Sequence, residues 1–278
     1  MKTLITASLI LFAISLTAQD FQGKAIYKTS AKSNFKIKDN QKGIDDKMKE
    51  EIQKRIQKMN QKTFILEFDK TSSIYKQEAA LQSPKSQAGK VVNVMSFGGS
   101  GSADIYYKNI KENRFANKTE IMGKAFLVED KLPKYDWELT SETKNIGIYT
   151  CYKATFSKEV ENTNISMKDG ETIEEKTKQT IVTTAWYTMQ IPVSNGPDNY
   201  QGLPGLILEI NDGKNLIVCT EIILNPTDKI SLEEPTKGKV VTQVEFNKIQ
   251  KEKSEELMEK MKSRNGIDLG NGMKIKMN

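Results

Sequence analysis

The stretch AWYTMQIPVSNGPDNYQGLPGLILEI, residues 185–210, determines the fold we expect. It joins an aromatic strand to an apolar strand through a segment rich in glycine and proline. Pro204-Gly205 suits the centre of a type II turn, because proline presets a negative φ and glycine accepts a positive one. The run from Leu206 to Ile210 is too apolar to face water on both sides, and it predicts a strand. Leu203 is expected to insert into the concave side of the sheet.

Two interpretations of this segment stay open. In the first, it is a structural corner of the sheet. In the second, it borders a binding mouth, and the residues around the corner contact a ligand. The candidate ligand-binding residues are then Trp186, Tyr187, Tyr200, Gln201, Gly202, Leu203, Pro204 and Gly205.

Outward from this segment, strand patterns recur at short spacing along most of the chain. They cover residues 23–30, 63–68, 73–75, 105–108, 114–122, 124–128, 135–142, 146–157, 181–189, 206–210 and 216–223. Asp212-Gly213 separates the last two runs and is a strong hairpin signal. Residues 158–179 are polar and charged, which predicts a long exposed hairpin insertion with a composition that permits disorder.

Helical spacing occurs in two places. Apolar residues recur every three or four positions from Ile44 to Met59, which predicts a helix over residues 43–62. This helix packs on the sheet or, alternatively, binds a partner or a membrane surface. A thinner stripe predicts a second helix over residues 246–264.

The expected fold class is therefore mainly β (α+β), with a single curved antiparallel sheet or half-barrel and one or two packing helices. A half-barrel wrapped around a helix, as in periplasmic lipoprotein carriers, fits the pattern as a fold-level analogy.

The composition excludes several classes of function. The chain has no histidine, which removes Ser-His-Asp and Cys-His mechanisms and the usual histidine ligands of catalytic zinc. The net charge is +6, but acidic and basic residues interleave, so we expect no nucleic-acid partner. We predict neither a cofactor nor a metal site.

The N-terminus has the pattern of a secretory signal over residues 1–18. Lys2 precedes an apolar run, and small residues follow at Thr17-Ala18. We expect cleavage near Ala18, export to the periplasm or beyond the cell, and no transmembrane segment in the mature chain. Residues 19–264 are expected to form a single domain, and residues 265–278 a C-terminal tail.

A set of motifs in fixed order precedes and includes the opening stretch. These are WEL at 137–139, YTCYKA at 149–154, AWYT at 185–188, IPV at 191–193 and GLPGLI at 202–207. In these motifs the chain resembles the GLPGLI family, over roughly residues 104–225. The resemblance implies an exported protein of Gram-negative bacteria, and it implies no activity.

Cys151 and Cys219 lie in two predicted strands of a chain that we expect to be exported, where disulfides persist. A disulfide requires neighbouring strands with Cα atoms about 5.5 Å apart. A Cys151–Cys219 disulfide and two separate buried thiols therefore both stay open.

An enzyme without histidine would depend on carboxylates. The candidates are Glu129, Asp130, Asp136, Glu138 and Glu209, and their spacing singles out none of them. We therefore expect an exported envelope protein that binds an apolar ligand or another envelope protein without catalysis. The alternative is a carboxylate-dependent hydrolase that acts on glycans. A third hypothesis is an interaction module that uses the insertion at 158–179 and the helices.

Overall fold

The computed structural model describes residues 21–31, 61–78, 104–168, 171–263, 267–268 and 274–275. The predicted signal sequence and most of the predicted helix at 43–62 lie outside these ranges. The last two positions of that helix, Gln61 and Lys62, begin a strand instead.

Most strands were predicted from the sequence, with small differences in their ends. They are β1 (Gly23–Ala31), β2 (Gln61–Phe68), β3 (Ser72–Gln77), β4 (Ile105–Asn109), β5 (Arg114–Ile121), β6 (Lys124–Lys131), β7 (Glu138–Ile146), β8 (Tyr149–Lys168), β9 (Glu171–Thr188), β10 (Leu206–Asn211), β11 (Asn215–Leu224), β12 (Lys239–Val241), β13 (Ile267–Asp268) and β14 (Lys274–Ile275).

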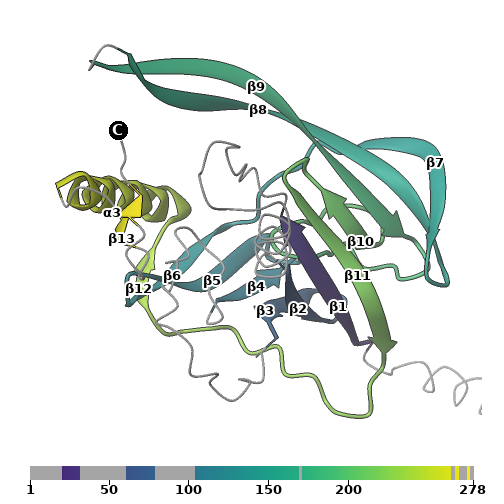
Figure 1. Cartoon of the computed structure of the whole chain (residues 1–278). Helices are drawn as coiled ribbons and strands as arrows, with labels where there is room; N and C mark the ends of the chain where they lie inside the picture. Colours follow the sequence, from purple (N-terminus) through teal and green to yellow (C-terminus); the bar gives the residue numbers. More distant parts are fainter. Residues whose placement is uncertain are drawn as a thin grey trace, which may run out of the picture.

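Twelve of these strands form one open, curved sheet (Figure 1). Their order is β12-β6-β5-β4-β3-β2-β1-β11-β10-β9-β8-β7. Neighbours pair antiparallel, except that β12 runs parallel to β6. The mainly β class is thus confirmed, but the small half-barrel is not, because the sheet is larger and stays unclosed. The described residues contain one helix, α3 (Gln243–Ser263), close to the second predicted helix.

Helix α3 begins with a capping box. The Thr242 N–H donates to Glu245 Oε2 at 2.8 Å, and the Glu245 N–H donates to Thr242 Oγ1 at 3.3 Å. One turn later, Phe246 packs edge-on against Phe126 of β6, with ring centroids 5.7 Å apart. Within the described ranges, we find no helix with the length and apolar character needed to span a membrane.

Strands β8 and β9 form a long hairpin that projects from the sheet (Figure 1). Their pairing continues from Tyr152–Tyr187 to Lys168–Glu171. The predicted hairpin insertion is therefore present, and it is a regular ribbon over its paired length.

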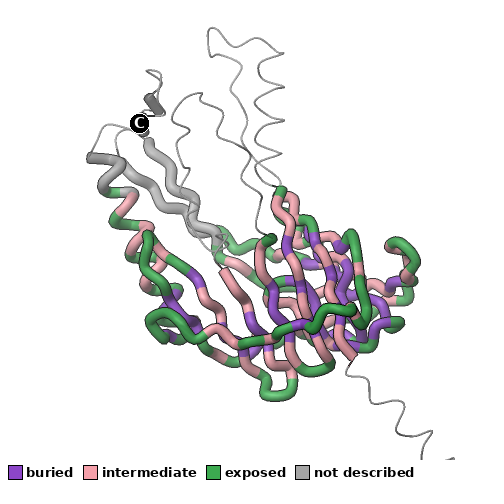
Figure 2. Tube along the Cα trace, turned by 90° about the horizontal axis from the view of Figure 1, so that it is seen from below, coloured by how far each residue is buried: buried purple, intermediate pink, exposed green. Residues whose placement is uncertain are grey.

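The main core lies on the inner face of the curved sheet. Residues directly opposite each other on antiparallel strands share a face, so Tyr27 and Phe64 point to the same side, as do Tyr75 and Tyr106. Tyr27, Phe64 and Tyr75 are buried. Figure 2 shows buried positions concentrated within the strands and exposed positions at the turns. The segment that joins β9 to β10 packs against this core.

Candidate functional site

The segment between β9 and β10 contains most of the opening stretch and folds into a closed loop. Backbone hydrogen bonds tie its two ends together. The Leu206 N–H donates to Ile191 O at 3.0 Å, and the Ile207 N–H donates to Asn195 O at 2.9 Å. We call residues 191–205 the signature loop.

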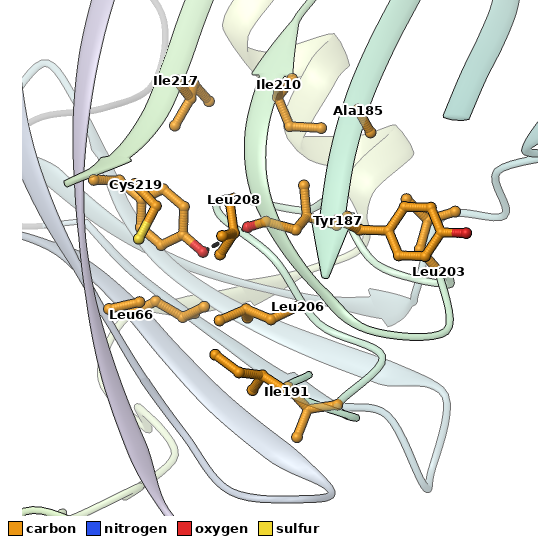
Figure 3. Close-up of a cluster of buried hydrophobic side chains, with 14 of the residues drawn as sticks. Leu66, Ala185, Tyr187, Ile191, Leu203, Leu206, Leu208, Ile210, Ile217 and Cys219 are labelled. Atoms are coloured by element: carbon orange, nitrogen blue, oxygen red, sulfur yellow. Dashed lines mark hydrogen bonds between the residues drawn. The ribbon is translucent and has the colours of Figure 1, made fainter. Parts of the chain in front are cut away.

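The signature loop fills part of the inner side of the sheet. Ile191 and Leu203 are almost completely buried, and Figure 3 shows them in one cluster with Leu66 and Leu206. Leu203 therefore has the buried position that its sequence context predicted. The Tyr27 hydroxyl also donates to the backbone oxygen of Ile207 at 2.7 Å, which joins the loop's exit strand to β1.

A fully buried lysine holds the outer part of the loop. Lys108 of β4 donates from Nζ to three backbone oxygens, those of Gly196 at 2.6 Å, Asp198 at 2.7 Å and Tyr200 at 3.1 Å. An ammonium has three donors, and here each one has an acceptor. Burial lowers the pKa of Lys108 to about 7, and the nearby Asp198 carboxylate opposes that shift. The lysine therefore determines where residues 196–200 lie.

Two glycines of the signature are required for different reasons, and neither forms the predicted turn. Gly202 has a φ of +95°, a conformation that residues with a Cβ rarely adopt. Gly205 has no positive φ, so the predicted type II turn at Pro204-Gly205 is wrong. Instead, a Cβ on Gly205 would lie 2.1 Å from the backbone oxygen of Thr188, so only glycine permits this close approach.

Four aromatic rings gather where the loop reaches the surface. Tyr200 stacks on Tyr135 with ring centroids 5.4 Å apart, and Phe156 meets Tyr135 edge-on at 5.3 Å. Trp137 lies 5.5 Å from Tyr135 and donates from Nε1 to Gln201 O at 2.9 Å. All four aromatic residues are half-buried. We call Tyr135, Trp137, Phe156 and Tyr200 the aromatic platform.

Asp198 lies beside this platform. The residue is exposed to solvent, but protein surrounds its carboxyl group. This partial burial raises the pKa of the carboxyl, and the nearby Lys108 opposes that shift. Burial raises the pKa of Tyr135, and burial raises that of Tyr200 to about 12; the Asp198 carboxylate adds to both shifts. Asp198 has a φ of +53°, which aspartate and asparagine tolerate better than most residues. The Asp198 carboxylate is therefore near enough to influence both phenols electrostatically.

The structure divides the predicted ligand-binding residues into three groups. Tyr200, Gln201 and Gly202 lie at the aromatic platform, and the Gln201 side chain donates to Pro133 O at 2.8 Å. The second group, Tyr187, Leu203 and Gly205, is buried. Pro204, which lies between Leu203 and Gly205 in the sequence, is exposed.

Trp186 forms the third group and is partly buried against the main core. Lys144 Nζ lies 4.4 Å from the centre of its ring and 2.7 Å from the Glu209 carboxylate. The ring contacts of Tyr200 are with Tyr135 and Trp137, and the described residues show no ring contact between Tyr200 and Trp186.

Sequence reasoning missed Lys108, Tyr135, Phe156 and Asp198. The signal for Lys108 was its position two residues after Tyr106 in a predicted strand, which places it on the same face. No local pattern indicates that Tyr135 and Phe156 meet Tyr200's segment, because the contact depends on how three distant segments cross.

The structure favours one of the two alternatives that the sequence left open for the cysteines. Cys151 and Cys219 are buried free thiols. They lie on β8 and β11, and β9 and β10 come between these strands in the sheet. They therefore lack the neighbouring strands that we required for a bridge. Burial raises the pKa of Cys151 to about 11 and that of Cys219 to about 12, which favours the unreactive thiol form.

Three of the five candidate carboxylates have separate partners. Glu209 pairs with Lys144, and Asp136 lies 3.2 Å from Lys134. Asp130 accepts from the Gln243 N–H at the start of α3. These contacts give the three carboxylates structural roles and do not place them in one groove.

Comparisons with known proteins give a family without an assigned function. A family profile described as "Protein of unknown function (Porph_ging)" matches residues 137–209. This supports the resemblance to a family of unknown function, and it does not confirm the GLPGLI name. No curated protein sequence matches the chain.

Among solved structures, two crystal forms of PNGF-II are similar, with TM-scores of 0.46 and 0.45 at 14% and 15% identity. The match covers 84% of this chain and 33% of each PNGF-II chain, so the present chain spans about a third of their length. Similarity at this level says nothing about function.

Proposed function

We propose that this chain is an exported, non-catalytic binding protein that holds a ligand on the aromatic platform. The observation that carries the proposal is the half-buried state of four rings that contact one another beside the signature loop. Together the rings leave apolar surface beside fixed polar groups, which is the combination that binding sites use. Tyr200 and Gln201 are the predicted site residues that take part.

The signature loop is what makes the platform rigid. Lys108 fixes the loop on either side of Asp198, and the Trp137–Gln201 hydrogen bond joins it to the segment before β7. A rigid platform loses little conformational entropy when a ligand binds, which favours affinity. A ligand with a flat apolar face would cover the rings and remove their remaining surface from water.

Energy transfer to a neutral apolar dye tests the proposal. The chain has two tryptophans, so Trp186→Phe leaves Trp137 as the single donor. We expect N-phenylnaphthylamine to quench Trp137 emission in a saturable way. Tyr200→Leu in the same background should weaken dye binding at least about fivefold, because it removes a stacking ring. Tyr149→Leu, at a half-buried tyrosine outside the platform, is the matched control. Equal dye affinity in the Tyr200 and Tyr149 variants would contradict the assignment.

Docking onto another envelope protein is a second candidate, supported by the hairpin. Among the described strands, β7 pairs with β8 only as far as Thr155, and β10 pairs with β9 only as far as Thr184. Beyond these points no third described strand pairs with the ribbon, and a two-stranded ribbon gains stability from a third strand. Replacing residues 158–179 with Asn-Gly should abolish cross-linking to an envelope partner in cells and leave dye binding intact. Unchanged cross-linking would refute this candidate.

A further inference from the structure

The outer face of the sheet, opposite the main core, carries an open cavity of about 500 Å³ over β11, β1 and β2. Lys28 follows the inward-facing Tyr27 on β1, so it points outward. Its partners Thr63 and Val218 lie beside it in one row. The next row on the same face consists of Ser30, Gln61 and Leu216. Thr29 and Lys62, which pair with each other between the rows, complete the lining of what we call the outer groove.

The outer groove is positively charged. Its lining contains the ammonium groups of Lys28 and Lys62 and, among the described residues, no carboxylate. Lys28 is exposed, and the described part of the chain shows no ion pair for it. Glu209 lies beside Val218 on the outer face, but Lys144 binds its carboxylate at 2.7 Å. An anion in the outer groove would therefore meet two ammonium groups, whereas a cation would meet like charge.

The other polar side chains of the groove indicate what the anion must be attached to. Thr29, Ser30 and Thr63 contribute hydroxyl groups, and Gln61 contributes an amide. Of these four residues, only Thr29 has a side-chain hydrogen bond within the described ranges, to Lys62 O at 3.3 Å. A purely apolar ligand body would take water from these groups without replacing its hydrogen bonds, which is unfavourable.

The size of the groove disfavours a bare inorganic ion. Its volume lies within the range of about 300–1,000 Å³ that is usual for small-molecule sites. An inorganic anion held by the two lysines would leave most of that space to water. Leu216 and Val218 add apolar surface that the C–H groups of an organic ligand can contact.

From these constraints we propose that the outer groove binds a hydroxylated organic anion, either a sugar phosphate or a sugar acid. Lys28 and Lys62 bind the phosphate or carboxylate, which is the chemistry that both ligands share. Ser30, Gln61 and Thr63 exchange hydrogen bonds with the hydroxyl groups. None of the groove residues belongs to the aromatic platform, so the two sites stand or fall separately.

Amide NMR spectra of the isotopically labelled chain test the groove with glucose 6-phosphate, glucuronate, neutral glucose and inorganic phosphate. We expect one or both anionic sugars to shift the amides of residues 28–30, 61–63 and 216–218 in a saturable way. The anionic sugar that binds more tightly shows whether phosphate or carboxylate is preferred. Glucose and inorganic phosphate should each bind at least about fivefold more weakly, because each lacks one part of the contacts.

A pair of lysine variants separates a site from general charge attraction. Lys28→Ala should weaken binding of the anionic sugar about fivefold, because it removes one of the two ammonium groups. Lys24→Ala is the matched control and should leave the affinity unchanged. Lys24 lies on the same face of β1 and carries the same charge, but it does not line the groove.

The remaining outcomes each overturn a stated part of the proposal. Absence of saturable shifts with both anionic sugars, or shifts that lie away from β1, β2 and β11, would remove the site. Equal affinity for neutral glucose would contradict the anionic character of the ligand, and equal affinity for inorganic phosphate would contradict its hydroxylated body. Equal losses in the Lys24 and Lys28 variants would attribute the binding to the net charge of +6 instead of the groove.

Discussion

Replacing Lys108 with methionine tests whether the buried ammonium holds the signature loop in place. Methionine keeps an unbranched side chain but leaves the backbone oxygens of Gly196, Asp198 and Tyr200 without their donor. An unpaired buried acceptor costs about 1–3 kcal/mol, so the three give at most roughly 3–9 kcal/mol, because the bonds to Asp198 and Tyr200 are only part-buried. The variant also avoids desolvating an ammonium, which offsets several kcal/mol. We expect the free energy of unfolding to fall by about 3 kcal/mol.

Urea unfolding followed by tryptophan emission measures this loss. The expected change is smaller than the total stability of a typical domain, so the variant should still fold. Lys118→Met, at a half-buried lysine in β5, is the matched control and should change stability by less than about 0.5 kcal/mol. The Lys108 variant should also bind N-phenylnaphthylamine more weakly, because Tyr200 loses its anchor. A Lys108→Met protein as stable as the parent would refute the reasoning, since the three hydrogen bonds would then not exceed the cost of burying the charge.

Three further predictions concern stability. In urea unfolding, Gly205→Ala should lower the free energy of unfolding by at least about 2 kcal/mol more than Gly202→Ala. The first variant adds a methyl group 2.1 Å from a backbone oxygen, whereas the second meets no atom nearer than 3.8 Å and adds about 1 kcal/mol of backbone strain. Equal losses would contradict this. The second prediction concerns pH. The pKa of Lys108 is about 7 in the folded chain and about 10.4 in the unfolded chain, so between these values the unfolded chain binds more protons. The free energy of unfolding should therefore rise with pH across this window, and a rise that persists in Lys108→Met would exclude Lys108 as its source. Thr242→Ala should destabilise the start of α3 by about 1 kcal/mol, because it removes the capping box. Amide hydrogen exchange in the first turn of α3 should become faster, and unchanged exchange there would show that the capping box contributes nothing.

Local patterns predicted the strands well because they report which residues face a core. The alternation around Tyr27 and the Asp212-Gly213 pair both depend on neighbours in sequence, and β1, β10 and β11 follow them. The extent of the sheet did not follow from such patterns. Strand number and closure depend on how strands far apart in sequence pair, as β1 does with β11.

The signature illustrates the same limit at the level of single residues. Pro204-Gly205 has the composition of a type II turn, but Gly205 is needed for its close approach to Thr188, and the positive φ occurs at Gly202. A glycine required by a tertiary contact cannot be distinguished by sequence from a glycine required by a turn. The sequence indicated only part of the proposed site for this reason: Tyr200 and Gln201 belong to the loop itself, whereas Tyr135 and Phe156 come from other segments that meet the loop only in the folded chain.

The filled inner side of the sheet determines where a ligand can bind. Curved sheets that carry apolar molecules hold them on the concave face. The half-barrel analogy and the expected apolar ligand implied the same location in this chain. Here Ile191, Val193 and Leu203 of the signature loop occupy that part of the interior themselves. The loop that closes the interior also brings Tyr200 and Asp198 to the surface, where Lys108 fixes them from below. In the binding proposal, the structural corner and the binding mouth are therefore the same segment seen from its two sides, and the proposed ligand lies at its outer edge.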